Sequence, residues 1–403
     1  MTTPPPGSFR RIVWPLAVAE ITAWATLYYS FPALMLEWEK DLGWSKTELT
    51  GALTLALLVS ASSAPFAGRI IDRGYGRYML TGASLFGACQ LLLLSQVTQL
   101  WQFYAVWFLI GLSMAGSLYD ACFSILTRTM GDKTKRAITL VTLVGGFAGT
   151  VSFPTANALS GSIGWRETLM IFAGALVVIA APLFWHAGGR ADSLPHAKLI
   201  PAGRKTEATL RLIRSPIFWF IAICFMSMAL NHGILINHLL PILDERGVHK
   251  ETAILAISML GPMQVMGRMA MMGAERHIST TALFIACTLA AATASVSLYG
   301  AVLIPALLVG FVLFQGAGHG LVSILRPVIV AEYLGVKDFG LTAGILAAMY
   351  LVGYALAPTV GSYIWEIGGY DRVIQFTIII ALVACAALVL VQQITKGRST
   401  PGN

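Results

Sequence analysis

Charged residues are scarce in this sequence of 403 residues, since Asp, Glu, Lys and Arg together make up only 11% of it. A soluble domain carries roughly 25% of such residues. The mean hydropathy is +0.74, and charge is absent from long stretches of the chain. We therefore expect lipid, rather than water, to surround most of the protein.

Several chemical signatures are also missing. The sequence has no CxxC pair, no Walker phosphate loop, no HExxH, no GxSxG and no cluster of cysteine and histidine. These absences argue against nucleotide hydrolysis, against an intramembrane enzyme and against a metal site or other cofactor. All five cysteines lie in apolar segments, where we expect buried packing residues rather than disulfides: Cys89, Cys122, Cys224, Cys287 and Cys385.

Long apolar runs take the place of charge. A spanning helix needs roughly 20 apolar residues, and twelve segments qualify: 12–36, 48–67, 78–96, 101–127, 137–158, 167–186, 216–243, 252–272, 280–298, 302–328, 340–362 and 372–394. Such continuous runs favour helices over a barrel. The predicted fold is an all-α integral membrane protein built from two pseudo-symmetric bundles of six helices.

The predicted organisation follows from the longest polar segment, 187–215, which connects the two halves on the cytoplasmic side. The N-terminal bundle covers 12–186 and the C-terminal bundle covers 216–394, followed by a tail at 395–403. Residues 1–11 are Pro-rich, and we expect them to be disordered. No small-residue cleavage site follows a short apolar core, so we expect no removable signal peptide.

The second half of the chain is a degenerate copy of the first. Residues recur 204 positions later in matching types: Gly43 and Gly247, Lys46 and Lys250, Gly116 and Gly320, Gly149 and Gly353, Pro154 and Pro358. Two similar membrane halves that face each other enclose a cavity, and rocking of one against the other gives alternating access. This repeat is typical of a transporter.

Lysine and arginine are distributed unequally over the connecting segments. With the N-terminus inside, the inner side carries nineteen of them and the outer side six, the latter being Lys40, Lys46, Arg166, Arg246, Lys250 and Arg372. The excess of positive charge on inner loops predicts cytoplasmic termini. We therefore expect a multi-pass protein of a bacterial inner membrane, with no nucleic-acid partner despite the net charge of +8.

The segment between the second and third apolar runs carries a motif. Its order, G-x3-D-R-x2-G-R, resembles the signature loop of the major facilitator superfamily and is formed by Gly68, Asp72, Arg73, Gly76 and Arg77. A weaker copy between the eighth and ninth runs contains Glu275 and Arg276. The resemblance implies that this gating loop stabilises the outward-open state, with Asp72 facing a helix N-terminus of the other half. The alternative is a plain turn that follows the positive-inside rule.

Ionisable residues inside the predicted spans are functional candidates, because placing them in a bilayer is energetically costly. All of them fall on the helices that line or flank the central cavity in the superfamily: Glu20, Asp120, His232, His238, Arg268, His319 and Arg326. We expect Glu20 or Asp120 to carry the proton, since burial favours the neutral carboxyl form. The alternative for Asp120 is a pairing with Arg73 or Arg77.

Arg268 is the first candidate for substrate binding, because a permanently charged planar fork suits a carboxylate. The segment from Gln264 to Arg268 resembles helix 8 of the monocarboxylate transporters and the oxalate:formate exchanger, in which an arginine at this place binds the substrate carboxylate. The segment from Tyr28 to Ala33 is similar to helix 1 of that group. The chain departs from the animal members at Gln264 and Ala33, where those proteins have Asp and Lys. The alternative is a structural bridge between Arg268 and a helix carboxylate.

Further substrate-binding candidates surround the same expected cavity. Arg326 is a second anion clamp or, alternatively, a cation that reaches the inner interface and pairs there with Glu332. The remaining candidates are polar or aromatic residues on helices expected to line the cavity: His319, His232, Asn231, Tyr28 and Tyr119. His232 and His238 lie six residues apart, on different helix faces, so that one is expected at the cavity and the other in packing.

The function expected from the sequence is secondary active transport of a small organic anion, a monocarboxylate, coupled to protons or by exchange. The protein would act as a monomer, with its substrate, protons and the lipid bilayer as partners. The alternative within the same superfamily is a drug or metabolite exporter that works by proton antiport. A more remote alternative is a membrane sensor that transports nothing.

Overall fold

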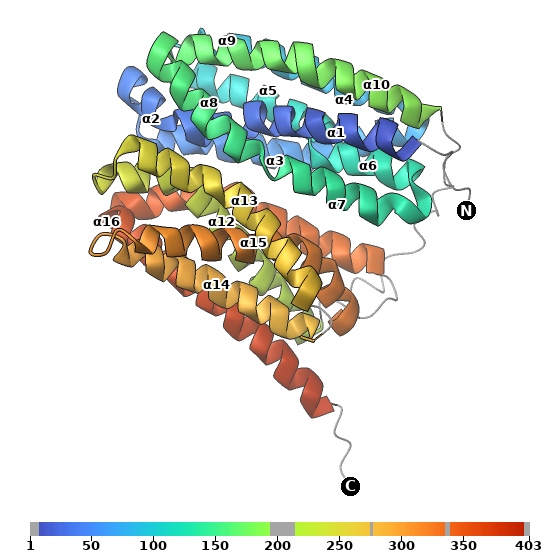
Figure 1. Cartoon of the computed structure of the whole chain (residues 1–403), viewed down its shortest axis with the longest axis vertical. Coiled ribbons are helices and arrows are strands. Elements are labelled where there is room, and N and C mark those ends of the chain that lie inside the picture. Colours follow the sequence, from blue (N-terminus) through green and yellow to red (C-terminus); the bar gives the residue numbers. More distant parts are fainter. Residues whose placement is uncertain (1–7, 194–213, 275–276, 335–338, 399–403) are drawn as a thin grey trace. The chain divides into compact units, whose positions relative to one another are not determined.

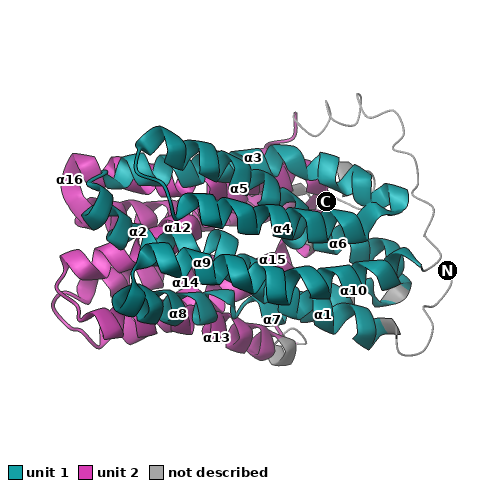
Figure 2. Ribbon diagram, turned by 90° about the horizontal axis from the view of Figure 1, so that it is seen from above, with its two compact units in different colours: residues 1–199 teal, residues 200–403 magenta. Residues whose placement is uncertain are grey.

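The computed structural model describes residues 8–193, 214–274, 277–334 and 339–398. Within these ranges all regular structure is helical (Figure 1). The chain divides into two compact units, Met1–Leu199 and Ile200–Asn403 (Figure 2). Each unit is described below by itself.

Unit 1 consists of helices that are repeatedly interrupted. Their bounds are α1 Ser8–Ala23, η1 Trp24–Tyr28, α2 Ser30–Leu42, α3 Lys46–Ile70, η2 Ile71–Tyr75, α4 Gly76–Leu94, α5 Leu100–Ser117, α6 Tyr119–Thr129, η3 Gly131–Lys133, α7 Thr134–Gly145, α8 Ala148–Ile163, α9 Trp165–Ala175, η4 Leu176–Ala180 and α10 Ala181–Asp192. Elements η1, η2 and η4 are π-helical turns. Four predicted spans are therefore interrupted within their length: the first at η1, the fourth between α5 and α6, the fifth between α7 and α8, and the sixth at η4.

Unit 2 has longer helices: α12 Pro216–Glu245, α13 Lys250–Ala274, α14 Thr280–Gly300, α15 Leu307–Leu334 and α16 Phe339–Arg398. The last of these holds two predicted spans, because the backbone leaves the helical conformation at Gly368 and Gly369. Gly369 has a φ of 71°, which glycine adopts readily because it has no Cβ.

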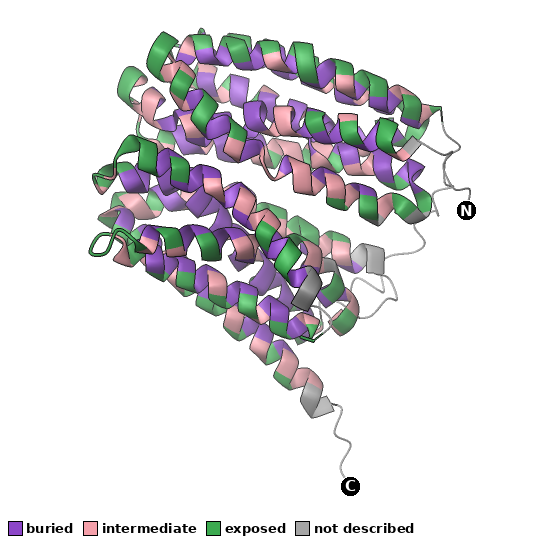
Figure 3. Ribbon diagram, in the orientation of Figure 1, coloured by how far each residue is buried: buried purple, intermediate pink, exposed green. Residues whose placement is uncertain are grey.

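The described helices suit a membrane. Nine helical stretches among the described residues are long and apolar enough to cross one, and two of these, Lys46–Leu94 and Thr342–Thr395, each contain two predicted spans. Large apolar side chains are exposed on the helix surfaces (Figure 3), and examples are Val178 at 73% and Leu255 at 62%. Exposed apolar surface on this scale would be unfavourable in water and is expected in contact with lipid.

The start of α3 has a capping box. The hydroxyl of Ser45 accepts a hydrogen bond from the backbone N–H of Glu48, and the Glu48 carboxylate accepts one from the backbone N–H of Ser45. This reciprocal pair satisfies two N–H groups that the helix leaves open. Just before it, Gly43 ends α2 with a φ of 69°. Gly247, the repeat of Gly43, has a φ of 68°, so these two glycines recur because both turns need a left-handed residue.

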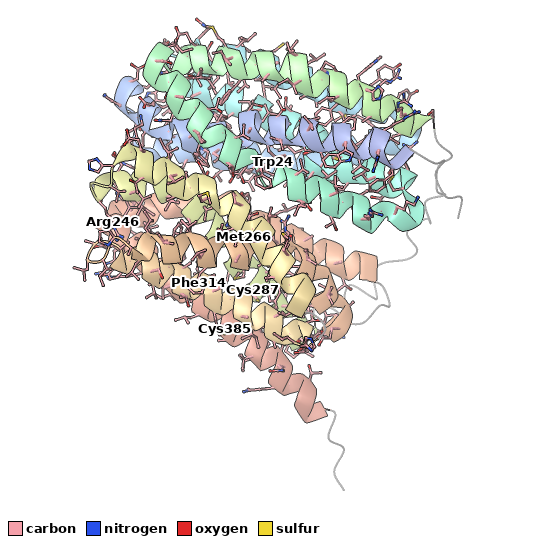
Figure 4. All side chains as sticks on the ribbon, viewed as in Figure 1. Trp24, Arg246, Met266, Cys287, Phe314 and Cys385 are labelled. Atoms are coloured by element: carbon pink, nitrogen blue, oxygen red, sulfur yellow. The ribbon has the colours of Figure 1, made fainter. Side chains whose placement is uncertain are left out.

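Each unit also has a polar clamp at its helix ends. In unit 1, Asp41 accepts hydrogen bonds from Arg166 at 2.8 Å and from the indole of Trp165 at 2.9 Å. These two donors hold the pKa of the Asp41 carboxyl below its ordinary value. In unit 2, Arg246 (labelled in Figure 4) donates a hydrogen bond to the carboxylate of Asp371 at 2.6 Å. Beside this pair, Trp365 donates to Glu245 at 3.0 Å, and Glu245 is the repeat of Asp41.

The cysteines are free thiols. Cys122, Cys224 and Cys287 are buried and Cys385 is partly buried. The expectation of burial is wrong for Cys89, which is exposed on α4. Periodicity within a single apolar segment does not separate a packed face from a lipid-facing one, because both are apolar.

Candidate functional site

The bends of unit 1 meet around one group of side chains. The π-helical turn η1 leaves the carbonyl of Ala25 available, and the hydroxyl of Ser152 on α8 donates to it at 2.7 Å. Tyr119, directly after the interruption between α5 and α6, packs on Trp24 of η1 with ring centroids 4.9 Å apart. It also stacks on Phe123 at 5.1 Å. Three interrupted helices thus place an aromatic cluster, formed by Trp24, Tyr119 and Phe123, beside α1.

Glu20 lies against this aromatic cluster, one turn before Trp24 on the same helix. Its side chain is 0% exposed. Neither carboxyl oxygen has a hydrogen-bond partner among the described residues, and the indole Nε1 of Trp24 also has none (Figure 4 labels Trp24). The thiol of Cys122 and the indole of Trp24 face the carboxyl group outside hydrogen-bond geometry. A carboxyl group in such a place is stable only in its neutral form or with a cation bound beside it.

Asp120 stands next to this site but in a different environment. It is exposed and belongs to the first turn of α6. Negative charge is favourable there, because the first N–H groups of a helix are open. No salt bridge among the described residues joins Asp120 to Arg73 or Arg77. Tyr28, also expected at the cavity, is 0% exposed and packs edge-on against Trp24.

The gating loop is held from within unit 1. The backbone N–H of Arg77 donates to the carboxylate of Asp192, at the end of α10, at 3.0 Å. The guanidinium group of Arg77 lies over the ring of Trp185 at 4.3 Å, in a place that Gly188 and Gly189 leave open. The sequence offered no sign of Trp185 and Asp192, because the contact joins residues more than a hundred positions apart.

The other gating-loop residues differ in exposure. Asp72 and Arg73 are exposed, Gly76 is buried and Gly68 is half-buried. Gly74 has a φ of 94° and lies close to Arg128. Arg128 is 7% exposed, although the sequence placed it among ordinary inner-loop cations. Glu275 and Arg276, the second copy of the loop, lie outside the described residues.

In unit 2 two histidines from different helices form a stack. The rings of His232 on α12 and His319 on α15 are 3.3 Å apart between centroids and 7° from parallel. The amide Nε2 of Gln315 lies 3.4 Å from Nδ1 of His232 and donates to Oδ1 of Asn231 at 3.4 Å. Asn231 in turn donates to the carbonyl of Thr377 at 3.0 Å. Asn231 therefore fixes Gln315 and, through it, one ring of the stack.

Arg326 extends this group along α15. Its guanidinium carbon lies 3.6 Å from the ring centroid of Tyr350 on α16. The ring of Tyr350 lies near-parallel to that of Tyr354, and the ring of Tyr354 to that of His232. Nε of Arg326 and Nδ1 of His319 have no hydrogen-bond partner among the described residues. We call Arg326, His319, His232, Tyr350 and Tyr354 the ring cluster.

Arg268 is positioned by a close contact between helices. Gly267 on α13 and Gly320 on α15 each approach the backbone of the other helix so closely that a Cβ would collide with it. Across this contact, Nε of Arg268 donates to the carbonyl of Gly320 at 2.9 Å, and the side chain is 9% exposed. Arg268 and Arg326 are both near enough to act electrostatically on His319. Four of the predicted substrate-binding residues are therefore neighbours in unit 2: Arg268, Arg326, His319 and His232.

Two other polar residues lie elsewhere. His238 is 0% exposed, with Nε2 at 2.8 Å from the carbonyl of Pro358 and Nδ1 at 3.3 Å from the Tyr370 hydroxyl. Glu332 accepts a hydrogen bond from Thr281.

Two residues of the group around His232, Gln315 and Tyr354, were not predicted from the sequence. The only signal for Tyr354 was its position four residues after Tyr350, which places both on one helix face.

Comparisons with known proteins agree on one family. Residues 14–312 match the sequence profile of the Major Facilitator Superfamily. The chain is 21% identical over 330 residues to the MFS transporter asaE of Aspergillus flavus. The aligned residues make up 81% of this chain and 73% of that protein. It is 30% identical over 179 residues to the multidrug resistance protein MdtG of Salmonella paratyphi C, or 44% of this chain and 43% of that protein.

A solved structure has a similar fold. It is the crystal structure of a bacterial homologue of the human lysosomal transporter Spinster, in an inward-facing and unoccupied conformation. The TM-score is 0.69 and the sequence identity 15%, with 99% of this chain and 100% of the other covered. At this identity the likeness shows the fold alone.

Proposed function

The chain belongs to the Major Facilitator Superfamily, and from this premise we propose that it carries a small organic anion, a monocarboxylate, by alternating access. Membership makes it a transporter rather than an enzyme, and the predicted fold class is confirmed. The proposal includes coupling to protons or exchange, a bacterial inner membrane, cytoplasmic termini and action as a monomer.

One observation supports the anion: the ring cluster contains two buried nitrogen atoms without hydrogen-bond partners, one of them an arginine N–H donor. Nε of Arg326 and Nδ1 of His319 are buried without partners, and no carboxylate takes part in the contacts described for these two residues. A buried donor without an acceptor costs roughly 1–3 kcal/mol. A substrate carboxylate would supply that acceptor, and the planar guanidinium group can bind it through two parallel hydrogen bonds.

The proton is assigned to Glu20. Its carboxyl group is fully buried and has no hydrogen-bond partner among the described residues, so the charged form is disfavoured until a conformational change admits water or a cation. Asp120 is the second candidate, and its exposure makes it the less demanding place for a charge.

The experiment is thermal unfolding of the purified protein in detergent, with lactate, pyruvate, acetate, oxalate, formate, neutral sugars and two lipophilic cations as ligands. A ligand that binds the folded state raises its apparent stability. We expect a carboxylate to stabilise the wild type and the control Arg10→Gln, which changes an exposed arginine outside the site. The shift should vanish in Arg326→Gln and weaken in Arg268→Ala. Stabilisation of Arg326→Gln equal to that of the wild type would contradict the anion assignment.

A second function, export of lipophilic cations, is favoured by the environment of Glu20. A buried carboxyl group beside Trp24 and Tyr119 offers negative charge and aromatic faces to an organic cation. One relative is named a multidrug resistance protein. In the same experiment this function predicts stabilisation by the lipophilic cations only, lost in Glu20→Gln and kept in Arg326→Gln.

A further inference from the structure

We propose that the transported anion is flat and conjugated, an aromatic carboxylate of the benzoate type, rather than a short aliphatic acid. This inference rests on the proposed anion transport and narrows its substrate class. It is carried by the ring cluster, in which four near-parallel rings from three helices stand beside the guanidinium group of Arg326.

The rings of the cluster share one orientation. Tyr350 and Tyr354 are 8° from parallel with centroids 6.5 Å apart, and Tyr354 and His232 are 21° from parallel at 6.4 Å. These separations are nearly twice the optimal carbon–carbon contact of about 3.5 Å. Within these two pairs the rings therefore do not cover one another's faces, unlike the face-to-face pair of His232 and His319. Both tyrosines are only half-buried, so part of each ring remains accessible to a third flat group.

Arg326 sets the plane of the bound anion. With its central carbon 3.6 Å from the Tyr350 centroid, the guanidinium group lies against the ring face, because a tilted group would collide with the ring at that distance. A carboxylate held by both arms of the fork lies in the guanidinium plane. A ring conjugated with that carboxylate lies in the same plane and runs parallel to the tyrosine rings. An acid with a saturated ring carries the same charge, but it has no flat face to place against the tyrosine rings.

Unsatisfied polar atoms border the same place. They are Nδ1 of His319 and Nε of Arg326. His319 is half-buried, while its stacking partner His232 is 5% exposed. The cluster thus combines buried nitrogen atoms that lack hydrogen-bond partners with rings that are only half-buried. A carboxylate on the edge of a flat ring matches both features.

The test compares two ligands with equal charge and similar size, benzoate and cyclohexanecarboxylate, by isothermal titration calorimetry on the full-length protein in detergent. Benzamide, which keeps the ring and lacks the charge, is the third ligand. We expect benzoate to bind about tenfold more tightly than cyclohexanecarboxylate, which is the size of effect that two aromatic contacts give. Benzamide should not bind.

Variants of Tyr354 separate stacking from folding. Tyr354→Leu should bring the two acids to equal affinity, whereas Tyr354→Phe, which keeps the ring, should preserve the preference for benzoate. Thermal unfolding without ligand checks that both variants are folded. If Tyr354→Leu does not fold, the comparison of the two acids on the wild type and on Tyr354→Phe still tests the preference for an aromatic carboxylate.

The outcomes distinguish this inference from the function on which it rests. Equal binding of benzoate and cyclohexanecarboxylate by the wild type, with both lost in Arg326→Gln, would overturn the aromatic preference and leave anion transport intact. Binding of benzamide as tightly as benzoate would overturn both, because charge would then play no part. Binding of neither acid, with stabilisation by a lipophilic cation, would likewise overturn both.

Discussion

At the residue scale, Gly111 lets α3 and α5 approach each other closely. Gly111 on α5 lies against the backbone carbonyl of Ala56, where an added Cβ would collide. Small residues let membrane helices approach closely, since packing and not the hydrophobic effect holds them together. The position therefore tolerates no enlargement unless the two helices separate.

Gly111→Ala should lower the stability of the protein by about 1–3 kcal/mol, the usual cost of overpacking. Gly174→Ala is the matched control, because no atom lies within 4 Å of the Cβ it would add. The control should be neutral or slightly stabilising, since alanine favours the helix. Thermal unfolding in one detergent measures both. Equal melting temperatures for the two variants would show that α3 and α5 do not pack as described.

For Glu20, the sequence predicted burial of the side chain but not the residues that surround it. Its position in an apolar segment predicted a buried carboxyl group, and the side chain is 0% exposed. Its neighbours Cys122 and Trp24 were not predicted, since Cys122 comes from another helix and contacts between helices are not written in one segment. The stack of His232 on His319 was missed for the same reason.

At the element scale, the π-helical turn η1 depends on support from α8. The turn leaves the carbonyl of Ala25 without its usual intrahelical donor, and the hydroxyl of Ser152 provides one. Interruptions of this kind are frequent at functional sites. Apolar length predicted the spans, but neither η1 nor the break between α7 and α8 has a hydropathy signature. Pro154 is a residue type that usually kinks or ends a helix, yet it lies inside the continuous helix α8.

Ser152→Ala should destabilise the protein by about 1–3 kcal/mol, because it leaves a buried carbonyl unsatisfied. Ser162→Ala is the control, since that exposed hydroxyl bonds only within its own helix, and its effect should stay within about 0.5 kcal/mol. Differential thermal unfolding gives both values. A larger loss for Ser162→Ala than for Ser152→Ala would contradict the described contact.

The clamp between α2 and α9 predicts a pH dependence. The pKa of Asp41 is lowered by Arg166 and Trp165, so its stabilising effect is present above the unfolded-state pKa of about 3.9. It is lost as the pH falls through the lowered value. Because both side chains are a third or more exposed, the effect should not exceed about 1 kcal/mol.

Asp41→Asn should therefore melt below the wild type at pH 7, and the difference should shrink as the pH is lowered toward 3. Melting temperatures of both proteins across that range test the sign. A difference that grows on acidification would mean that Asp41 is not held in its charged form.

At the scale of the whole molecule, the distribution of lysine and arginine predicts both termini in the cytoplasm. A green fluorescent protein fused after Asn403 should fluoresce in a bacterial host. An alkaline phosphatase fused at the same place should be inactive, because that enzyme needs an oxidising compartment. Active phosphatase with a dark fluorescent fusion would reverse the topology. Inserting the phosphatase after Gly43, in a predicted outer turn, provides the positive control.

The clamps of the two units have opposite polarity. In unit 1 the acid Asp41 lies at the end of α2 and the base Arg166 at the start of α9. In unit 2 the base Arg246 directly follows α12 and the acid Asp371 lies in α16, just after the glycine break. The two ion pairs do not use repeated positions, because at the offset of 204 residues Arg246 and Asp371 correspond to Leu42 and Glu167. The halves thus share the place of the clamp and not its partners, so in related sequences each pair should co-vary within its own half, independently of the other.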